Sequence, residues 1–182
     1  AIDGNKAWPL ADTQMTALTP IDPAHFNGIV KPHAERPIAC GYSGNSAGVG
    51  TIRQQVLTEI MFRNLLTVRL RDGSAESYDD YCAFLASCRL NLNVALSGTQ
   101  AAQQVKGRVV ETGLAAGCLL ENTGSPTSDW FKPGEDYLEY VSIPHAIELI
   151  RHCANRPDDT QAMGERLRAK VLAAHTPRHF WG

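Results

Sequence analysis

Residues 105–121, with the sequence VKGRVVETGLAAGCLLE, constrain the fold more than any other stretch, because a helix pattern runs directly into a strand pattern. Four apolar residues recur at helical spacing and predict one buried face: Val105, Val109, Val110 and Leu114. Gly117 is expected to end this helix, since glycine adopts the left-handed conformation at little cost. The apolar run at 118–120 that follows has the length of a short buried strand.

The opposite face of this helix is charged. Arg108 and Glu111 are three residues apart and share a face, and Lys106 lies at the N-terminus, where the helix dipole and backbone N–H groups favour an anion. Cations at a helix start and a carboxylate one turn further along suit a phosphorylated sugar, with phosphate on the cations and hydroxyls on the carboxylate. The alternative is an exposed Arg108–Glu111 ion pair, which contributes only a few tenths of a kcal/mol.

The same alternation of strand and helix patterns continues on both sides of this stretch. Strands are expected at 38–40, 66–70, 90–96, 118–120 and 137–141, and helices at 52–64, 77–88, 105–117, 144–156 and 158–174. The alternation predicts an α/β fold: a Rossmann-like, doubly wound parallel sheet of about five or six strands in a three-layer α/β/α arrangement. Thr51, Ser77 and Asp158 are expected to cap the helices that follow them.

The chain divides into two parts by its proline content. Five of the ten prolines lie at or before Pro37, a density that predicts extended structure. Residues 1–36 are therefore expected to form an extended arm or interdomain linker segment, and residues 37–182 a single folded domain.

Composition narrows the classes of function. A formal net charge of -2 gives no indication of bulk binding to nucleic acid or anionic membranes. No apolar run approaches the roughly 20 residues that a transmembrane helix needs, and no signal peptide is visible. The five cysteines are scattered, without a CxxC or zinc-type spacing, which favours a reduced, cytoplasmic protein.

Ligands of doubly wound sheets bind at the carboxyl ends of the strands, where the strand order reverses. Three polar loops are expected to reach that edge, at residues 41–50, 97–104 and 121–129. Together with the first turn of the 52–64 helix, they provide further candidate substrate-binding residues: Ser43, Gly44, Asn45, Arg53, Thr123 and Gly124.

Several of these candidates have a second interpretation. The loop GYSGNSAGVG could hold phosphate through backbone N–H groups, or it is an ordinary strand-to-helix turn, because it matches neither G-x-G-x-x-G nor the Walker pattern. Arg53 is either an anion contact or a surface charge. Ser43 and Ser46 lack a nucleophile context of the G-x-S-x-G type. His145, His152 and His175 are expected to be surface or packing residues.

Several segments in this order resemble the C-terminal half of a GT-B glycosyltransferase, in particular the CgeB type named for a spore maturation protein. The segments are PIDPAHF, PIACGYSGN, SYDDYCAFLASCRLNLNVAL, KGRVVETGLAAGCLLE, FKPGEDYLEYVSIPHAIELI and LAAHTPRHF. The resemblance covers roughly residues 17–180. It implies a single GT-B half, the domain that binds a nucleoside diphosphate sugar as donor substrate, without a cofactor.

The resemblance also implies roles for particular residues. Glu111 is expected on the ribose hydroxyls, and Lys106 and Arg108 near the diphosphate, in place of a metal ion; no Asp-x-Asp motif is present. No catalytic residue is assigned. The acceptor-binding half would precede Ala1, so the chain is expected to be a fragment that is inactive alone. The alternative function is a nucleotide-binding or interaction module of the same fold without catalysis.

Overall fold

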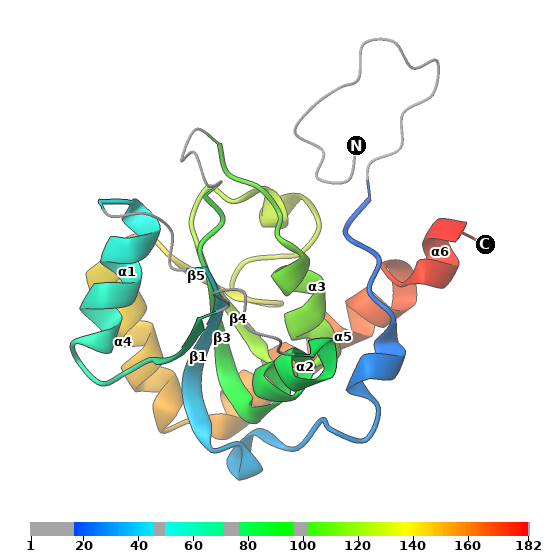
Figure 1. Ribbon diagram of the computed structural model, residues 1–182, viewed down its shortest axis with the longest axis horizontal. Helices are drawn as coiled ribbons and strands as arrows, with labels where there is room; N and C mark the ends of the chain where they lie inside the picture. The colour runs from blue at the N-terminus through cyan, green and yellow to red at the C-terminus, as the bar shows by residue number, and fades with distance from the viewer. Residues whose placement is uncertain (1–16, 46–49, 71–76, 97–101, 182) are drawn as a thin grey trace.

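The computed structural model describes residues 17–45, 50–70, 77–96 and 102–181, which form a five-stranded parallel sheet covered by helices on both faces (Figure 1). The strands are β1 (Ile38–Gly44), β2 (Thr67–Leu70), β3 (Cys88–Asn93), β4 (Cys118–Asn122) and β5 (Leu138–Tyr140). Their order is β2-β1-β3-β4-β5, and each neighbouring pair is parallel. The predicted Rossmann-like, doubly wound sheet is confirmed.

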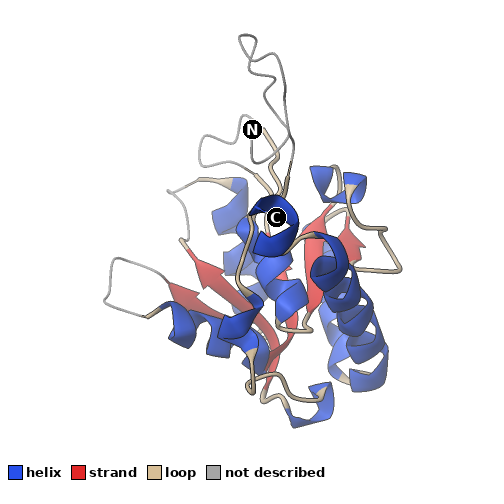
Figure 2. Cartoon of the chain, turned by 90° about the vertical axis from the view of Figure 1, so that its right-hand side faces the viewer, coloured by secondary structure: helices blue, strands red, loops and turns tan. Residues whose placement is uncertain are grey.

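Helices lie on both faces of the sheet, and Figure 2 shows the strands between them from the side. The helices are α1 (Ile52–Met61), α2 (Tyr78–Ser87), α3 (Gly107–Leu114), α4 (Ile143–Ala154), α5 (Pro157–Ala174) and α6 (Pro177–Trp181). Short 3-10 turns are η1 (Pro23–Phe26), η2 (His33–Glu35) and η3 (Pro126–Asp129). Helices α1 and α4 pack on one face, and α2, α3 and most of α5 on the other.

Two apolar cores result, one on each face of the sheet. Strand β3 explains how they are separated: Leu90 and Leu92 point into the core under α1 and α4, whereas Asn91 and Asn93 alternate with them. Both asparagines are fully buried. Buried amides need hydrogen-bond partners, so this strand brings polar groups to the interior near the carboxyl edge of the sheet.

Local predictions at the helix starts are mostly confirmed. The hydroxyl of Thr51 accepts from the backbone N–H of Gln54, and that of Ser77 from the backbone N–H of Asp80. The predicted cap at Asp158 is wrong, because α5 begins one residue earlier, at Pro157, and Asp158 lies in its first turn. A proline at the first helical position needs no N–H partner.

The predicted end of α3 is also wrong in detail. The residue with positive φ is Ala116, at 49°, and not Gly117. Gly117 is required for a different reason, since a Cβ there would lie 2.4 Å from Nδ2 of Asn91. Strand β1 likewise continues through Gly44, so the first four residues of the predicted 41–50 loop belong to the sheet.

Residues 17–36 run across the α2, α3 and α5 side of the domain and end at the amino edge of the sheet (Figure 1). Phe26 of η1 is buried in that core, and η2 packs on α5 through the hydrogen bond from His33 N–H to Gln161. The division of the chain at residue 36 stays a prediction. Among the described helices, none has the length and apolar character to cross a bilayer.

Candidate functional site

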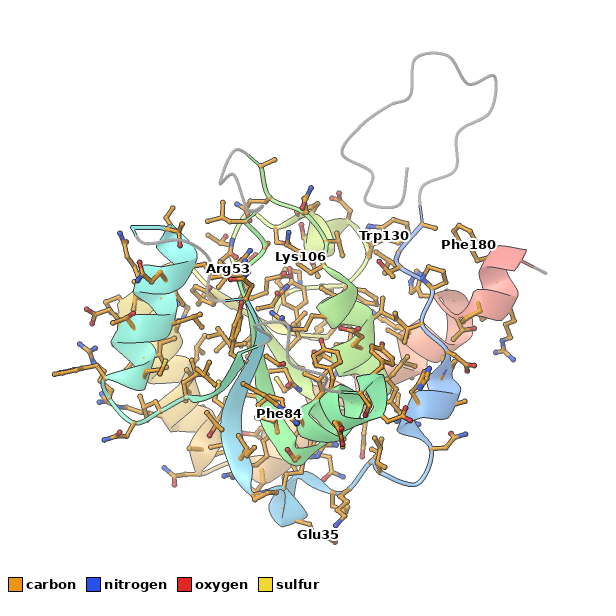
Figure 3. The ribbon with its side chains drawn as sticks, viewed as in Figure 1. Glu35, Arg53, Phe84, Lys106, Trp130 and Phe180 are labelled. Atoms are coloured by element: carbon orange, nitrogen blue, oxygen red, sulfur yellow. The ribbon has the colours of Figure 1, made fainter. Side chains whose placement is uncertain are left out.

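The strand order reverses between β1 and β3, and a pocket of about 410 Å³ opens at the carboxyl ends of these two strands. Crevices at such switch points are the ligand sites of open α/β sheets. Figure 3 shows Lys106 and Arg53 at this edge, at the opposite end of the sheet from Glu35. Six side chains that line the pocket matter for its chemistry: Tyr42, Arg53, Asn93, Lys106, Arg108 and Glu111.

The N-terminus of α3 forms one wall. Lys106 occupies the N-cap position without a side-chain cap to the helix. The N–H of Val109 donates to the carbonyl of Lys106 at 3.0 Å, whereas the N–H groups that precede it in the first turn of a helix have no acceptor within the helix. Gly107 lines the pocket next to them. The Lys106 ammonium group donates to Oε1 of Gln104 at 2.8 Å. This end of α3 therefore combines a cation with the positive end of a helix dipole.

Arg108 is held between the ends of β1 and β3. Its Nη1 donates to Oδ1 of Asn93 at 3.1 Å, and its Nη2 donates to the backbone carbonyl of Ser43. The guanidinium also lies over the ring of Tyr42, 4.7 Å from the ring centroid. A Cβ at Gly44 would lie 2.6 Å from Nη2. The cation is thus fixed at the switch in strand order, and glycine at position 44 leaves room for it.

Glu111 is buried, with 8% of its surface exposed. Its Oε1 accepts from the hydroxyl of Tyr78 at 2.9 Å and its Oε2 from that of Tyr81 at 2.6 Å. Burial and the Glu111 carboxylate raise the pKa of Tyr78, and burial raises that of Tyr81, so both hydroxyls stay donors. The alternative of an exposed Arg108–Glu111 ion pair does not hold, because the Glu111 carboxylate is buried. Each carboxylate oxygen can accept a further hydrogen bond.

The other predicted residues separate into two groups. Gly44 adjoins Arg108. Asn45 and Arg53 both line the pocket. Nη2 of Arg53 also donates to the backbone carbonyl of Leu96 at 2.6 Å. Ser43 takes part through its carbonyl, whereas its buried hydroxyl has no hydrogen-bond partner among the described residues.

Thr123 and Gly124 lie away from this group. Thr123 lines a neighbouring apolar pocket of about 290 Å³, and Gly124 is exposed in the turn after β4. Ser46 lies outside the described residues. The structure thus brings the β1 end and the start of α3 together and leaves the loop after β4 apart.

Sequence reasoning missed several residues of the site, chiefly Asn93, Tyr42 and Tyr81, together with Glu121, which contacts Asn93 from behind the pocket. Oε1 of Glu121 accepts from Nδ2 of Asn93 at 2.5 Å, and burial raises the pKa of Glu121 to about 7. The signal for Asn93 was the alternation of Asn91 and Asn93 with Leu90 and Leu92 in a strand pattern. Two asparagines in a buried strand indicate a polar function rather than packing, because asparagine is mostly exposed in folded proteins.

Two further kinds of functional group, a metal centre and a histidine in the pocket, are absent from the part of the chain that the structure describes. No group of three or more His, Cys, Asp or Glu side chains there could hold a metal ion. His175 is not in the pocket: its ring packs edge-on against Trp130 and Phe131, with ring centroids 5.4 Å apart in each case.

Comparison with known sequences gives one family. A family model described as "Glycosyl transferase-like" matches residues 51–181. None of the curated proteins matches the chain.

Solved structures share the fold at low sequence identity. An α1,3-fucosyltransferase solved with GDP-fucose superposes with a TM-score of 0.56 and 15% identity, over 74% of this chain and 40% of that one. A glycosyltransferase from Rickettsia africae ESF-5 gives 0.61 and 7%, over 91% and 54%. Sucrose-phosphate synthase from Thermosynechococcus elongatus gives 0.60 and 9%, over 91% and 49%. The chain therefore spans about half or less of the length of these structures.

Proposed function

Because the chain belongs to the glycosyl transferase-like family, we propose that its pocket at the β1–β3 switch binds a nucleoside diphosphate sugar. One observation carries the proposal: Lys106, Arg108 and the buried carboxylate of Glu111 line a single pocket at the start of one helix. In this assignment Lys106 and Arg108 bind the diphosphate, and Glu111 accepts hydrogen bonds from ribose hydroxyls.

The pocket suits this ligand in size and charge. Its volume of about 410 Å³ lies within the usual range for small-molecule sites. The reaction is transfer of the sugar to an acceptor hydroxyl, and the nucleoside diphosphate is the leaving group. Its charge develops next to Lys106, Arg108 and the first turn of α3, where preorganised cations and N–H groups stabilise it electrostatically.

The proposal also concerns the whole enzyme to which this domain belongs. The chain acts as the donor-binding half of a GT-B enzyme of the CgeB type, and a separate acceptor-binding half supplies the second substrate. This division is supported by the 40–54% of the solved structures' length that the chain spans. A cytoplasmic location agrees with the five free, buried cysteines.

The test is a calorimetric titration of UDP-, GDP-, ADP- and dTDP-sugars into the 182-residue protein. One nucleotide class should bind with a Kd on the order of micromolar, and Arg108→Ala should weaken it. Arg151→Ala serves as the control, because Arg151 is an exposed cation on α4 away from the pocket. If no nucleotide sugar binds more tightly than about 1 mM, the proposal is wrong.

A further inference from the structure

We infer that Glu121 is a positioning residue of this pocket, which orients Arg108 through Asn93 and takes up a proton when a diphosphate binds. The inference rests on the proposed function, because it concerns the same ligand. Glu121 lies outside the pocket lining and acts through another side chain.

The geometry is a relay of three residues from the interior to the pocket. Glu121 and Asn93 are partners in the β3–β4 ladder, and both are fully buried. Nδ2 of Asn93 donates to Oε1 of Glu121 at 2.5 Å, while Oδ1 of Asn93 accepts from Nη1 of Arg108 at 3.1 Å. An amide has one donor end and one acceptor end. The carboxyl group therefore fixes which end of Asn93 faces the cation.

The second oxygen of Glu121 is the atom that can hold the proton. Oε2 is buried and has no partner at hydrogen-bonding geometry among the described residues. Ionisable or polar groups face the carboxyl group from α3, β3, the β4–β5 connection and β5: Arg108, Asn93, Ser125, Thr127, Tyr137 and Tyr140. Burial raises the pKa of Glu121 to about 7, and the hydroxyl of Thr127, the amide of Asn93 and the charge of Arg108 oppose that rise.

A bound diphosphate weakens the effect of Arg108, whose positive charge limits the rise in the pKa of Glu121. It neutralises the positive charge of Arg108 and adds negative charge on the same side of Asn93, so ionised Glu121 becomes less favourable. The pKa of Glu121 therefore rises further in the complex, and binding near neutral pH takes up a proton. By linkage, affinity for the diphosphate falls as the pH rises through about 7. The protonated group keeps Oε1 as acceptor for Asn93, so the relay persists.

The experiment is calorimetry with the nucleotide sugar that binds the wild type best, in two buffers of different ionisation enthalpy. A nucleotide sugar is the right probe because its diphosphate diester keeps a constant charge across the range. Between about pH 6 and 8.5 the wild type should take up a fraction of a proton and lose affinity by about three- to tenfold.

Two variants separate titration from orientation. Glu121→Gln retains an acceptor for Asn93 but has no proton to exchange, so proton uptake and the pH dependence of binding should disappear. Glu121→Met removes the acceptor at similar length, so at about pH 6 it should bind the nucleotide sugar at least fivefold more weakly than Glu121→Gln does. Affinity for the bare nucleoside should be alike in both. Glu139→Gln is the matched control, because Glu139 is the ladder partner of Glu121 on β5.

The outcomes distinguish this inference from the proposed function. If the wild type binds the nucleotide sugar without proton uptake, or if Glu121→Gln keeps the wild-type pH profile, the inference is overturned and the function stands. If no nucleotide sugar binds the wild type, both fall. A wild type that binds without proton uptake overturns the inference even if both variants fail to fold.

Discussion

At the scale of single residues, the pocket combines side chains that are already engaged with the protein. Arg108 is held by Asn93 and Ser43, and Glu111 by two tyrosine hydroxyls. A group held in place loses less side-chain entropy when a ligand binds. The two residues should therefore act as a preorganised pair, with the cation on the phosphate side and the carboxylate on the ribose side.

Substitutions at these two residues should have different signatures. Arg108→Ala should weaken a nucleoside diphosphate about tenfold or more and the bare nucleoside little, because charge-assisted hydrogen bonds contribute about 1.5–3 kcal/mol. Glu111→Gln should weaken both ligands about tenfold, since ribose is common to them. Calorimetric titration of both ligands measures this, with melting temperatures as the control. Equal affinities in all three proteins would contradict the assignment.

Gly44→Ala should lower both stability and diphosphate affinity. The backbone φ of Gly44 is 144°, and the new Cβ would lie 2.6 Å from Nη2 of Arg108. Strained backbone costs on the order of 1–3 kcal/mol, and the displaced guanidinium should weaken phosphate binding. Gly28→Ala is the matched control, because Gly28 has a φ of 74° with nothing within 4 Å of its Cβ. Gly28→Ala should lose stability but keep its affinity for the diphosphate. Loss of affinity in both variants would contradict a steric effect on Arg108.

At the scale of elements, α3 is anchored at its carboxyl end by side chains of the segment before β1 and of α5. Arg36 donates to the carbonyl of Ala115 at 2.9 Å, and Nε2 of His33 donates to that of Ala116 at 2.8 Å. Arg168 of α5 donates to the carbonyl of Leu114. These donors satisfy carbonyls that the helix itself leaves open. The segment before β1 thus fixes the helix that carries the pocket.

Arg36→Ala should destabilise the protein by about 3 kcal/mol or more. The buried guanidinium donates at 2.9 Å to three carbonyls, those of Lys31, Cys88 and Ala115, and all three lose a charged partner. Arg36→Lys should recover little, because an ammonium group lacks the planar fork. Urea unfolding measures the loss. Arg63→Ala is the control, since its exposed pair with Glu59 should contribute less than about 1 kcal/mol. A loss at Arg36 as small as that control would contradict the anchor.

At the scale of the whole molecule, two buried ionisable groups act on stability in opposite directions. Burial lowers the pKa of His33 from 6.5 to about 4, so acid favours unfolding as the pH falls from about 6.5 towards 4. Burial raises the pKa of Glu121 from 4.5 to about 7, so its destabilising effect grows as the pH rises from about 4.5 through 7. Each displacement corresponds to about 3 kcal/mol, and the two effects oppose each other over the same pH range in the wild type.

Removing one group at a time should reveal both effects. On acidification from about pH 7.5 to 4.5, His33→Gln should gain stability relative to the wild type, and Glu121→Gln should lose it. Gln at position 33 keeps an N–H for the carbonyl of Ala116, the acceptor of His33 Nε2. Urea midpoints across the pH range measure the difference. Parallel pH curves for the three proteins would show that neither pKa is displaced in the folded protein.

Nucleotide binding should not depend on a divalent metal ion. Lys106 and Arg108 supply positive charge where the phosphates are proposed to lie. Titration of the nucleotide sugar into the wild type should give the same affinity with and without EDTA. Loss of binding in EDTA that magnesium or manganese restores would reassign the phosphate contacts to a metal ion.

Much of the fold could be predicted because its signals are local. The helical spacing of Val109, Val110 and Leu114 and the apolar run after Gly117 predict a helix, a turn and a strand, whatever surrounds them. The caps at Thr51 and Ser77 act within one turn of their own helices. The end of α3 could not be placed as well, because Gly117 is needed against Asn91, which is distant in sequence.

The sequence by itself determined the alternation of strands and helices, the parallel sheet that follows from it, and the charged face of residues 106–111, because each depends on spacing along one segment. Only the tertiary structure decided what those charges contact. Glu111 is buried by Tyr78 and Tyr81 of α2, and Arg108 reaches Asn93 of β3 and, through it, Glu121 of β4. Such partners depend on strand order and helix packing, and a buried carboxyl group takes its pKa from neighbours that no local pattern contains.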